Sequence, residues 1–209
     1  VNFDIKQAVS HASKLPAFLQ NDATAACAAE LTFGNPHRYD NYLYIYIGYF
    51  IGGGIVLNGA IFEGPSGNAA ALGPMPVRRQ NNQSSQSQLL HNASKFSLQC
   101  LIEKAGGEPS IIWGDESNWG ELGDILIDWV GQLAEDLAYA IVSTISIIDF
   151  PAVVIDGDIP APVRELITQA VRQKLEKINQ QGLSPVTITE GSLGRNARVL
   201  GGASLPLLA

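Results

Sequence analysis

Residues 41–62 form an uncharged segment that is long enough to cross a lipid bilayer, which takes about 20 residues. Five glycines interrupt the segment, and Asn58-Gly59 is a dipeptide typical of tight turns between apolar strands. Aromatic and β-branched side chains dominate residues 42–47, as they do in buried strands. We therefore expect a small antiparallel meander of strands at 42–47, 54–58 and 60–62 instead of a membrane helix.

The same segment contains a glycine-rich turn, residues 48–54, that looks like a phosphate-cradling hairpin. Phosphate approaches a backbone turn closely only where side chains are absent, because glycine leaves the N–H groups open. Tyr49 and Phe50 place two large rings in that space. A buried strand that enters a bulge is the alternative interpretation, and it leads to the same outcome. Either way, the sequence predicts that this turn no longer holds a nucleotide.

The rest of the chain shows helical and strand patterns. Helices are expected at 1–19, 23–33, 94–104, 119–148 and 162–180, and further strands at 152–155 and 186–189. Strand and helix alternate in the second half, which favours an α/β layer with a mainly parallel sheet. Two segments are interpreted as loops, the small-residue stretch 64–73 and the polar run 79–88, and the second is expected to be mobile.

The composition of the chain argues against nucleic acid as a direct partner and indicates a reducing environment. With 209 residues and a net charge of −7, the chain offers no basic face for nucleic acid, so we do not expect it to bind DNA by itself. Cys27 and Cys100 lie far apart and outside any CxxC pattern, which favours a reducing, cytoplasmic setting over a disulfide framework or zinc ribbon. The chain starts at Val1 without a secretory signal, and we expect it to be part of a longer protein.

Four separated patches resemble one protein family in their order and spacing. The patches are Leu15–Ala26, Ile47–Gly59, Gly67–Met75 and a C-terminal pair at 153–157 and 192–203. They resemble the proline-led strand with its Asn-Asp-Ala motif, the glycine hairpin, the sugar loop, and the C-terminal strand with the closing helix of the ROK family. This family contains bacterial sugar kinases and sugar-responsive transcriptional repressors, and the resemblance covers nearly the whole chain.

The resemblance implies an actin-like ATPase fold, in which sugar and nucleotide bind between two ribonuclease-H-like lobes. Residues 1–209 would form the C-terminal lobe, an α/β unit whose mixed sheet is flanked by helices. The N-terminal lobe and the winged helix-turn-helix of the family's repressors lie outside this chain, so DNA contact is expected only through such an upstream segment. The long helix at 119–148 is a candidate for packing between lobes or subunits, with core packing as the favoured alternative.

Asn21 and Asp22 match the family's sugar-binding pair. In the kinases, the matching aspartate is the general base that takes a proton from the sugar hydroxyl, and the asparagine hydrogen-bonds the sugar. Asp22 is equally suited to cap the following helix, where a carboxylate accepts backbone N–H bonds. The sequence leaves both roles open, and the two roles are compatible.

The sugar loop departs from the family pattern. The family's Glu and His, which hydrogen-bond the hexose hydroxyls, are replaced by Ala71 and Pro74, so a changed or weakened sugar preference is expected. Asn68 is either a sugar contact or, in the interpretation that we favour, a turn residue. No cysteine lies between Met75 and Lys95, so the zinc site common in the family is not expected here.

The nucleotide hairpin is altered as well. The kinases carry a Thr-Gly pair at the positions of Tyr49 and Phe50, although Gly48, Gly52 and Gly54 retain the glycine pattern around it. Phosphoryl transfer depends on positioning and charge stabilisation, so the loss of this pair argues against kinase activity.

The segment Asp156-Gly157-Asp158 adds two carboxylates where the kinases favour glycines, and these carboxylates are expected to repel a triphosphate. A strand end that caps the next helix is the alternative interpretation.

Taken together, the sequence and the resemblance lead us to expect neither ATP nor a metal cofactor, no membrane contact, and a homo-oligomer. The leading hypothesis is the effector-binding and oligomerisation lobe of a ROK transcriptional regulator. The alternatives are an ATP-dependent sugar kinase of the glucokinase type and a structural domain that has lost ligand binding.

Overall fold

The structure is a computed structural model, and it describes residues 3–35, 37–77, 87–113 and 116–208. Five strands form one mixed sheet in the order β3-β2-β1-β6-β7. The strands are β1 (Tyr42–Ile47), β2 (Ile51–Leu57), β3 (Ala60–Ile61), β6 (Ala152–Gly157) and β7 (Thr187–Glu190). β1, β6 and β7 run parallel, whereas β2 and β3 extend the sheet as an antiparallel meander. The expected meander and the parallel second half are thus confirmed.

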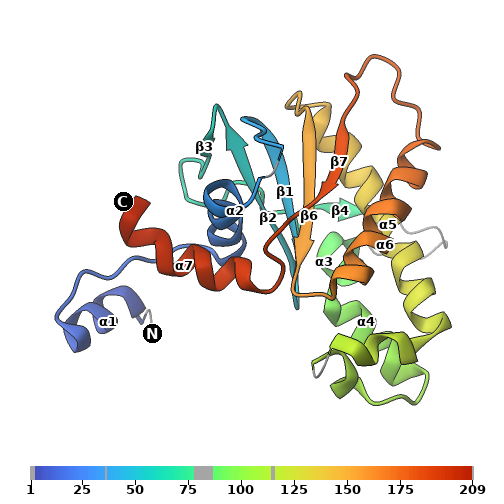
Figure 1. Ribbon diagram of the computed structural model, residues 1–209, viewed down its shortest axis with the longest axis horizontal. Helices are drawn as coiled ribbons and strands as arrows, with labels where there is room; N and C mark the ends of the chain where they lie inside the picture. The colour runs from blue at the N-terminus through green and yellow to red at the C-terminus, as the bar shows by residue number, and fades with distance from the viewer. Residues whose placement is uncertain (1–2, 36, 78–86, 114–115, 209) are drawn as a thin grey trace.

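Helices cover both faces of this sheet (Figure 1). On one face lie α2 (Asp22–Phe33) and α7 (Asn196–Leu208), and on the other lie α5 (Asp124–Ile145) and α6 (Ala161–Leu175). The short helices α3 (Leu89–Asn92) and α4 (Lys95–Lys104) pack beside α5, and two 3-10 helices span Pro109–Ile112 and Glu116–Leu122. A mixed α/β sheet flanked by helices is the expected fold class.

Two further strands, β4 (Pro76–Val77) and β5 (Ser87–Gln88), pair outside the main sheet. Apart from β5, the polar run 79–88 that the sequence marks as mobile lies outside the described residues.

Strand β1 explains why the uncharged segment is so apolar. Its residues alternate between two cores: Leu43, Ile45 and Ile47 join the larger core with α5 and α6, and Tyr42, Tyr44 and Tyr46 join a smaller core with α2. A strand that is buried on both faces appears in sequence as a continuous hydrophobic run. Among the described residues, no helix has the length and apolar character needed to cross a membrane.

The glycines of the hairpin lie inside β2, which begins at Ile51 and not at Gly54 as expected. Gly52 and Gly54 face α2 so closely that a Cβ on Gly52 would lie 2.6 Å from the Cβ of Ala23, and a Cβ on Gly54 would overlap Cys27. These two glycines therefore let α2 lie directly on the sheet. Helix packing explains their presence without a phosphate site.

Three helices are shorter than the sequence patterns indicate. Helix α1 spans only Ile5–Ser13 and ends where Lys14 adopts a left-handed conformation with a φ of 57°. Helix α5 starts at Asp124, because Gly123 turns the chain with a φ of 49° after the preceding 3-10 segment. Helix α6 ends at Leu175. Local backbone geometry thus ends helices that hydrophobic periodicity alone would extend.

Helix α5 is a core helix. Ten of its 22 residues are buried, and they belong to the larger hydrophobic core. Core packing is the role that the sequence favoured for this helix. A part in contacts between lobes or subunits stays a prediction.

Candidate functional site

A cavity of about 550 Å³ opens beside the hairpin that joins β1 to β2. Its walls come from the start of α2, the end of β1, the hairpin, the loop at residues 68–74, α3 and α7. It collects predicted residues from three separate segments: Asn21, Asp22, Asn68, Ala71 and Pro74 of the sugar motifs, and Tyr49, Phe50 and Gly52 of the hairpin. Gly48 and Gly54 do not line it. The predicted residues therefore meet at one place, and their contact with a ligand stays a prediction.

Asn21, and not Asp22, is the N-cap of α2. The side-chain oxygen of Asn21 accepts hydrogen bonds from the N–H groups of Ala23 at 3.0 Å and Thr24 at 3.2 Å. Asp22 takes the first helical position, where its carboxylate meets the positive end of the helix dipole. The N-cap position considered for Asp22 is therefore wrong, but its carboxylate does accept a hydrogen bond from the N–H of Ala23 at 2.9 Å. Its side chain stays 66% exposed, and it lines the cavity.

Arg198 of α7 reaches the same end of the cavity, and sequence reasoning missed it. Its Nη1 lies 3.4 Å from Oδ2 of Asp22, and its Nη2 lies 3.7 Å from Oδ2 of Asp158. Arg198 thus connects the start of α2 to the segment after β6. In the sequence, this arginine lies within the C-terminal patch 192–203, but no signal shows that this face of α7 meets α2.

Tyr46 contributes a buried side chain to the cavity wall. The residue is 2% exposed, yet its hydroxyl has no hydrogen-bond partner among the described residues. Burial raises the pKa of Tyr46 to about 12, and the positive charge and proximity of Arg198 oppose that rise, although no contact between the guanidinium and the hydroxyl has hydrogen-bond geometry. Tyr46 thus forms part of the cavity wall, while its hydroxyl is inaccessible and lies behind that wall.

The backbone of the loop at residues 68–74 is held in place beside the cavity. The N–H of Leu90 donates to the carbonyl of Gly73, and the N–H of Met75 donates to the carbonyl of Leu72, both at 3.0 Å. Ala70 has a φ of 57°, a left-handed conformation that costs a non-glycine residue about 1–2 kcal/mol. Such strain clusters at ligand sites, which agrees with the position of this loop.

The tip of the hairpin is bound to the start of α4. The carbonyl of Gly48 accepts from the N–H of Lys95 at 3.0 Å, and the carbonyl of Tyr49 accepts from the N–H of Phe96 at 3.1 Å. The ring centroids of Tyr49 and Phe50 lie 4.7 Å apart, and each lies 5.8 Å from that of Phe96. Tyr49 and Phe50 remain 39% and 52% exposed. The two rings are therefore held in an aromatic cluster that lines the cavity.

Asp156 does not face a ligand, which corrects the expected repulsion of a triphosphate. Its fully buried carboxylate accepts hydrogen bonds from the hydroxyl of Tyr44 at 2.9 Å, from Nη1 of Arg164 at 3.1 Å and from the N–H of Gly194 at 3.1 Å. Burial raises the pKa of Asp156, against the opposing effects of the Gly157 N–H and of Arg164. Asp156 therefore joins β6 to its neighbours inside the protein.

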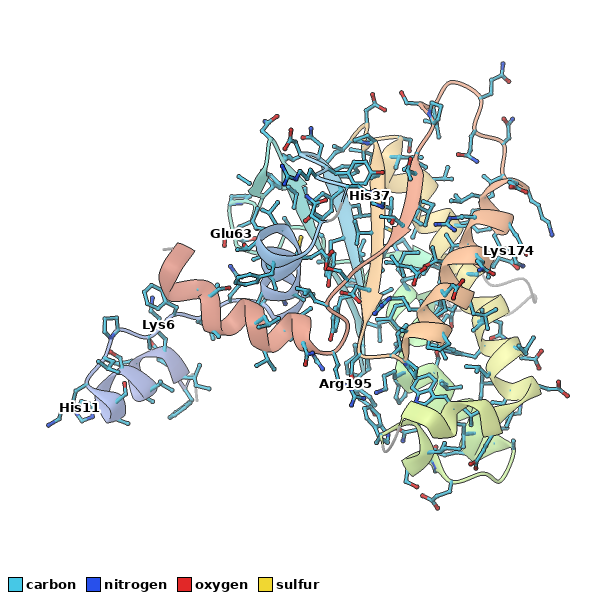
Figure 2. All side chains as sticks on the ribbon, viewed as in Figure 1. Lys6, His11, His37, Glu63, Lys174 and Arg195 are labelled. Atoms are coloured by element: carbon cyan, nitrogen blue, oxygen red, sulfur yellow. The ribbon has the colours of Figure 1, made fainter. Side chains whose placement is uncertain are left out.

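Asp158 is surrounded by cations. Its carboxylate lies 3.3 Å from Nζ of Lys95, 3.3 Å from Nε of Arg195 and 3.7 Å from Nη2 of Arg198. Arg195 precedes the first turn of α7 (Figure 2). Three cations around one carboxylate give this region no negative charge with which to repel a phosphate. The prediction that ATP does not bind therefore rests on the hairpin alone.

A second cavity, of about 510 Å³, lies apart from these residues. Its lining includes Lys6 and Glu63, which Figure 2 labels, and none of the predicted site residues. Within the described ranges, no group of three or more His, Cys, Asp or Glu side chains is placed to hold a metal ion. The cavity beside the hairpin is thus the candidate site.

Solved structures of known proteins share this fold. A ROK family glucokinase from Streptomyces griseus, solved in complex with glucose and AMPPNP, has a TM-score of 0.76 at 23% identity, over 96% of this chain and 71% of its own. A ROK family transcriptional regulator, a homolog of the E. coli MLC protein, has a TM-score of 0.70 at 22% identity, over 95% of this chain and 54% of its own. These likenesses confirm the expected actin-like ATPase fold.

Sequence comparison leads to the same group of proteins. The xylose repressor of Bacillus subtilis is 23% identical over 98% of this chain and 54% of its own length. The chain thus spans about half the length of the curated relatives that it matches. Repressors and kinases are both similar to it, so these likenesses do not separate the two functions. The sequence pattern of the ROK family matches residues 1–207, and the chain belongs to the ROK family.

Proposed function

We propose that this chain is the effector-binding and oligomerisation part of a sugar-responsive ROK transcriptional regulator that performs no phosphoryl transfer. The hairpin carries the proposal. Tyr49 and Phe50 line the cavity with two rings, and by resemblance they replace the Thr-Gly pair with which the kinases of the family cradle nucleotide phosphate. The polar residues of the same cavity, Asn21 and Asp22 above all, remain suited to sugar hydroxyls.

The N–H groups at the start of α4, next to the hairpin, are already engaged. A helix N-terminus binds phosphate through free N–H groups, but the hairpin carbonyls and the capping residue Ser94 accept hydrogen bonds from those groups at α4. Phosphoryl transfer needs donors that are positioned for the transferred group, so their engagement elsewhere supports a binding role.

A sugar at the start of α2 would be coupled directly to α7. Its hydroxyls can donate to the carboxylate of Asp22 and accept from the amide N–H₂ of Asn21, whose oxygen is used in capping. Asp22 pairs with Arg198, and α7 packs along α2. A sugar that binds one arrangement of these elements more tightly shifts the population toward it, and a DNA-binding segment attached to a homo-oligomer would respond.

An ATP-dependent sugar kinase is the second candidate, and the position of Asp22 favours it. The carboxylate of Asp22 is 66% exposed and lines the cavity, so it can accept a proton from a sugar hydroxyl, as the general base of the family's kinases does, while it keeps its contacts with Arg198 and the N–H of Ala23. The rings of Tyr49 and Phe50 would have to move aside for phosphate to approach. Both candidates bind sugar, so nucleotide binding separates them.

Calorimetric titration of the natural full-length protein with a panel of pentoses and hexoses tests the sugar site. Saturable heat is expected from one of the sugars. The Asp22→Asn variant should weaken that binding by about tenfold or more, because a charged acceptor is lost. Asp128→Asn, which changes an exposed aspartate on α5, is the control and should bind like the unchanged protein. No binding of any sugar, or unaltered affinity in Asp22→Asn, would contradict the proposed site.

A further inference from the structure

The lining of the cavity beside the hairpin combines a group of polar side chains with a pair of aromatic rings. Asn21, Asp22 and Arg198 form the polar group, which we call the polar end, and Asp22 and Arg198 form an ion pair within it. Tyr49 and Phe50 line the same cavity with exposed rings. A ligand that fills such a cavity needs hydroxyls on one part and an apolar face on another.

The cavity is larger than one sugar requires. A hexose has 12 non-hydrogen atoms and a volume near that of six water molecules, roughly 180 Å³ at about 30 Å³ each. The cavity of about 550 Å³ therefore has room for a second ring beside the sugar.

Tyr49 is held in place by contacts with other aromatic rings of the protein. The centroid of Tyr49 lies 5.5 Å from that of Trp113, in addition to its contact with Phe96. The Nζ of Lys95, a buried residue, lies 4.0 Å from the centroid of the Trp113 ring, within the range of a cation–π interaction. Contacts from α4 and the 3-10 segment thus hold Tyr49 in position before any ligand arrives, which lowers the entropy cost of stacking on it.

We infer that the ligand of this cavity is a glycoside, whose sugar occupies the polar end and whose apolar, ring-shaped aglycone stacks on Tyr49 and Phe50. This inference rests on the proposed function, because the same polar end binds the sugar. The aromatic rings supply contact area and stacking, while Asn21 and Asp22 fix the orientation of the sugar. The two rings that obstruct phosphate thereby form the aglycone subsite.

Titration of the natural full-length protein with phenyl and methyl glycosides of glucose and xylose, in both anomers, tests this subsite. The phenyl glycoside should bind about tenfold more tightly than the matching methyl glycoside, because ring stacking and burial add to the sugar contacts. Tyr49→Ala and Phe50→Ala should each reduce this advantage, and the double variant should abolish it. The measured quantity is the ratio of phenyl to methyl glycoside affinity within each variant, so a change in affinity that both glycosides share cancels.

Tyr139→Ala removes an exposed tyrosine from α5 and is the matched control, which should keep the full advantage of the phenyl group. Equal affinity for phenyl and methyl glycosides contradicts the inference and leaves the sugar-binding proposal standing. If the phenyl glycoside still binds more tightly than the methyl glycoside in the double variant, the inference is likewise contradicted and the sugar-binding proposal stands. If the aromatic cluster packs against another protein surface instead, the phenyl group gains nothing. Failure of the free sugars and of all the glycosides to bind contradicts both proposals.

Discussion

The carboxylate of Asp22 and the guanidinium of Arg198 lie 3.4 Å apart, which joins the first turn of α2 to α7 at the wall of the cavity. The two side chains are 66% and 36% exposed, and an ion pair of this kind contributes about 0–1 kcal/mol to folding. We therefore expect the pair to act on the ligand, because it keeps the Asp22 carboxylate at the polar end of the cavity.

Replacement of the Arg198 guanidinium separates the effect of the ion pair on folding from its effect on sugar binding. Arg198→Gln should lower the free energy of unfolding by no more than about 1 kcal/mol, while it weakens sugar binding several-fold. Chemical denaturation and calorimetry measure the two quantities. Lys174→Gln breaks a similarly exposed ion pair with Glu135 on the opposite face of the sheet, and it should leave sugar affinity unchanged. Equal sugar affinities in the two variants would exclude a role for Arg198 in orienting Asp22.

Two tyrosines on the same face of β1 should respond in opposite ways to loss of the hydroxyl. The hydroxyl of Tyr46 is inaccessible and makes no hydrogen bond to the described residues, so Tyr46→Phe should leave stability unchanged or raise it, and should change sugar binding little. The hydroxyl of Tyr44 donates to buried Asp156, so Tyr44→Phe should cost about 1–3 kcal/mol. Denaturation of both variants, with titration of Tyr46→Phe, checks the pair. Strong destabilisation by Tyr46→Phe would mean that its hydroxyl has a structural partner.

Alkaline pH should destabilise the protein through ionisation of Tyr46. The pKa of Tyr46 is raised by burial from 10.0 to about 12, so the folded state retains a proton that the unfolded chain has lost. Its stabilising contribution is complete below pH 10 and is lost as the pH rises from 10 through 12. Denaturation curves across this range should show a decline that is shallower in Tyr46→Phe. Ionisation of Tyr46 near pH 10 in the folded protein, seen in the ultraviolet difference from Tyr46→Phe, would contradict the burial argument.

Adjacent glycines in α7 offer a test of how that helix is held. A Cβ on Gly201 would overlap the backbone oxygen of Ala25 in α2, whereas a Cβ on Gly202 would meet nothing within 4 Å. Gly201→Ala should therefore destabilise the protein by about 1–3 kcal/mol or more and displace Arg198 from the cavity. Gly202→Ala should be neutral or stabilising by up to about 1 kcal/mol, because alanine favours a helix. Equal thermal stability of the two variants would show that α7 does not pack on α2 in this way.

Replacement of the strained loop residue Ala70 by glycine should raise the stability of the protein. Ala70→Gly relieves the left-handed conformation and should raise stability by up to about 1 kcal/mol, after allowance for the greater freedom of glycine in the unfolded chain. Ala69→Gly, at the preceding position with ordinary φ, should lower stability instead. Thermal unfolding of the two variants measures the difference. A loss of stability in both would mean that Ala70 is not strained.

Much of the arrangement could be predicted from local patterns. The strand at residues 42–47 follows from its aromatic and β-branched run, and its bounds agree with β1. Asn21, the hairpin and the loop at residues 68–74 are each identified by a local motif, and all three line one cavity in the structure. Asn21 and Asp22 are both good caps one residue apart, so propensity could not decide which of them begins the helix.

The rest depends on contacts between distant segments. Arg198 reaches Asp22 only because Gly201 lets α7 approach α2, and neither residue carries a motif that reveals this. Asp156 is an acidic residue after a strand in the sequence, and only the surrounding Tyr44 and Arg164 make it a buried structural group. Such partners are brought together by packing and not by spacing along the chain.

Titration of magnesium ATP into the sugar-saturated full-length protein, with phosphorus NMR of the same sample, distinguishes a regulator from a sugar kinase. We predict no saturable heat and no sugar phosphate, because we expect the rings of Tyr49 and Phe50, which line the cavity, to obstruct phosphate at the hairpin. Saturable heat from ATP together with the appearance of a sugar phosphate would contradict the account and identify the protein as a sugar kinase.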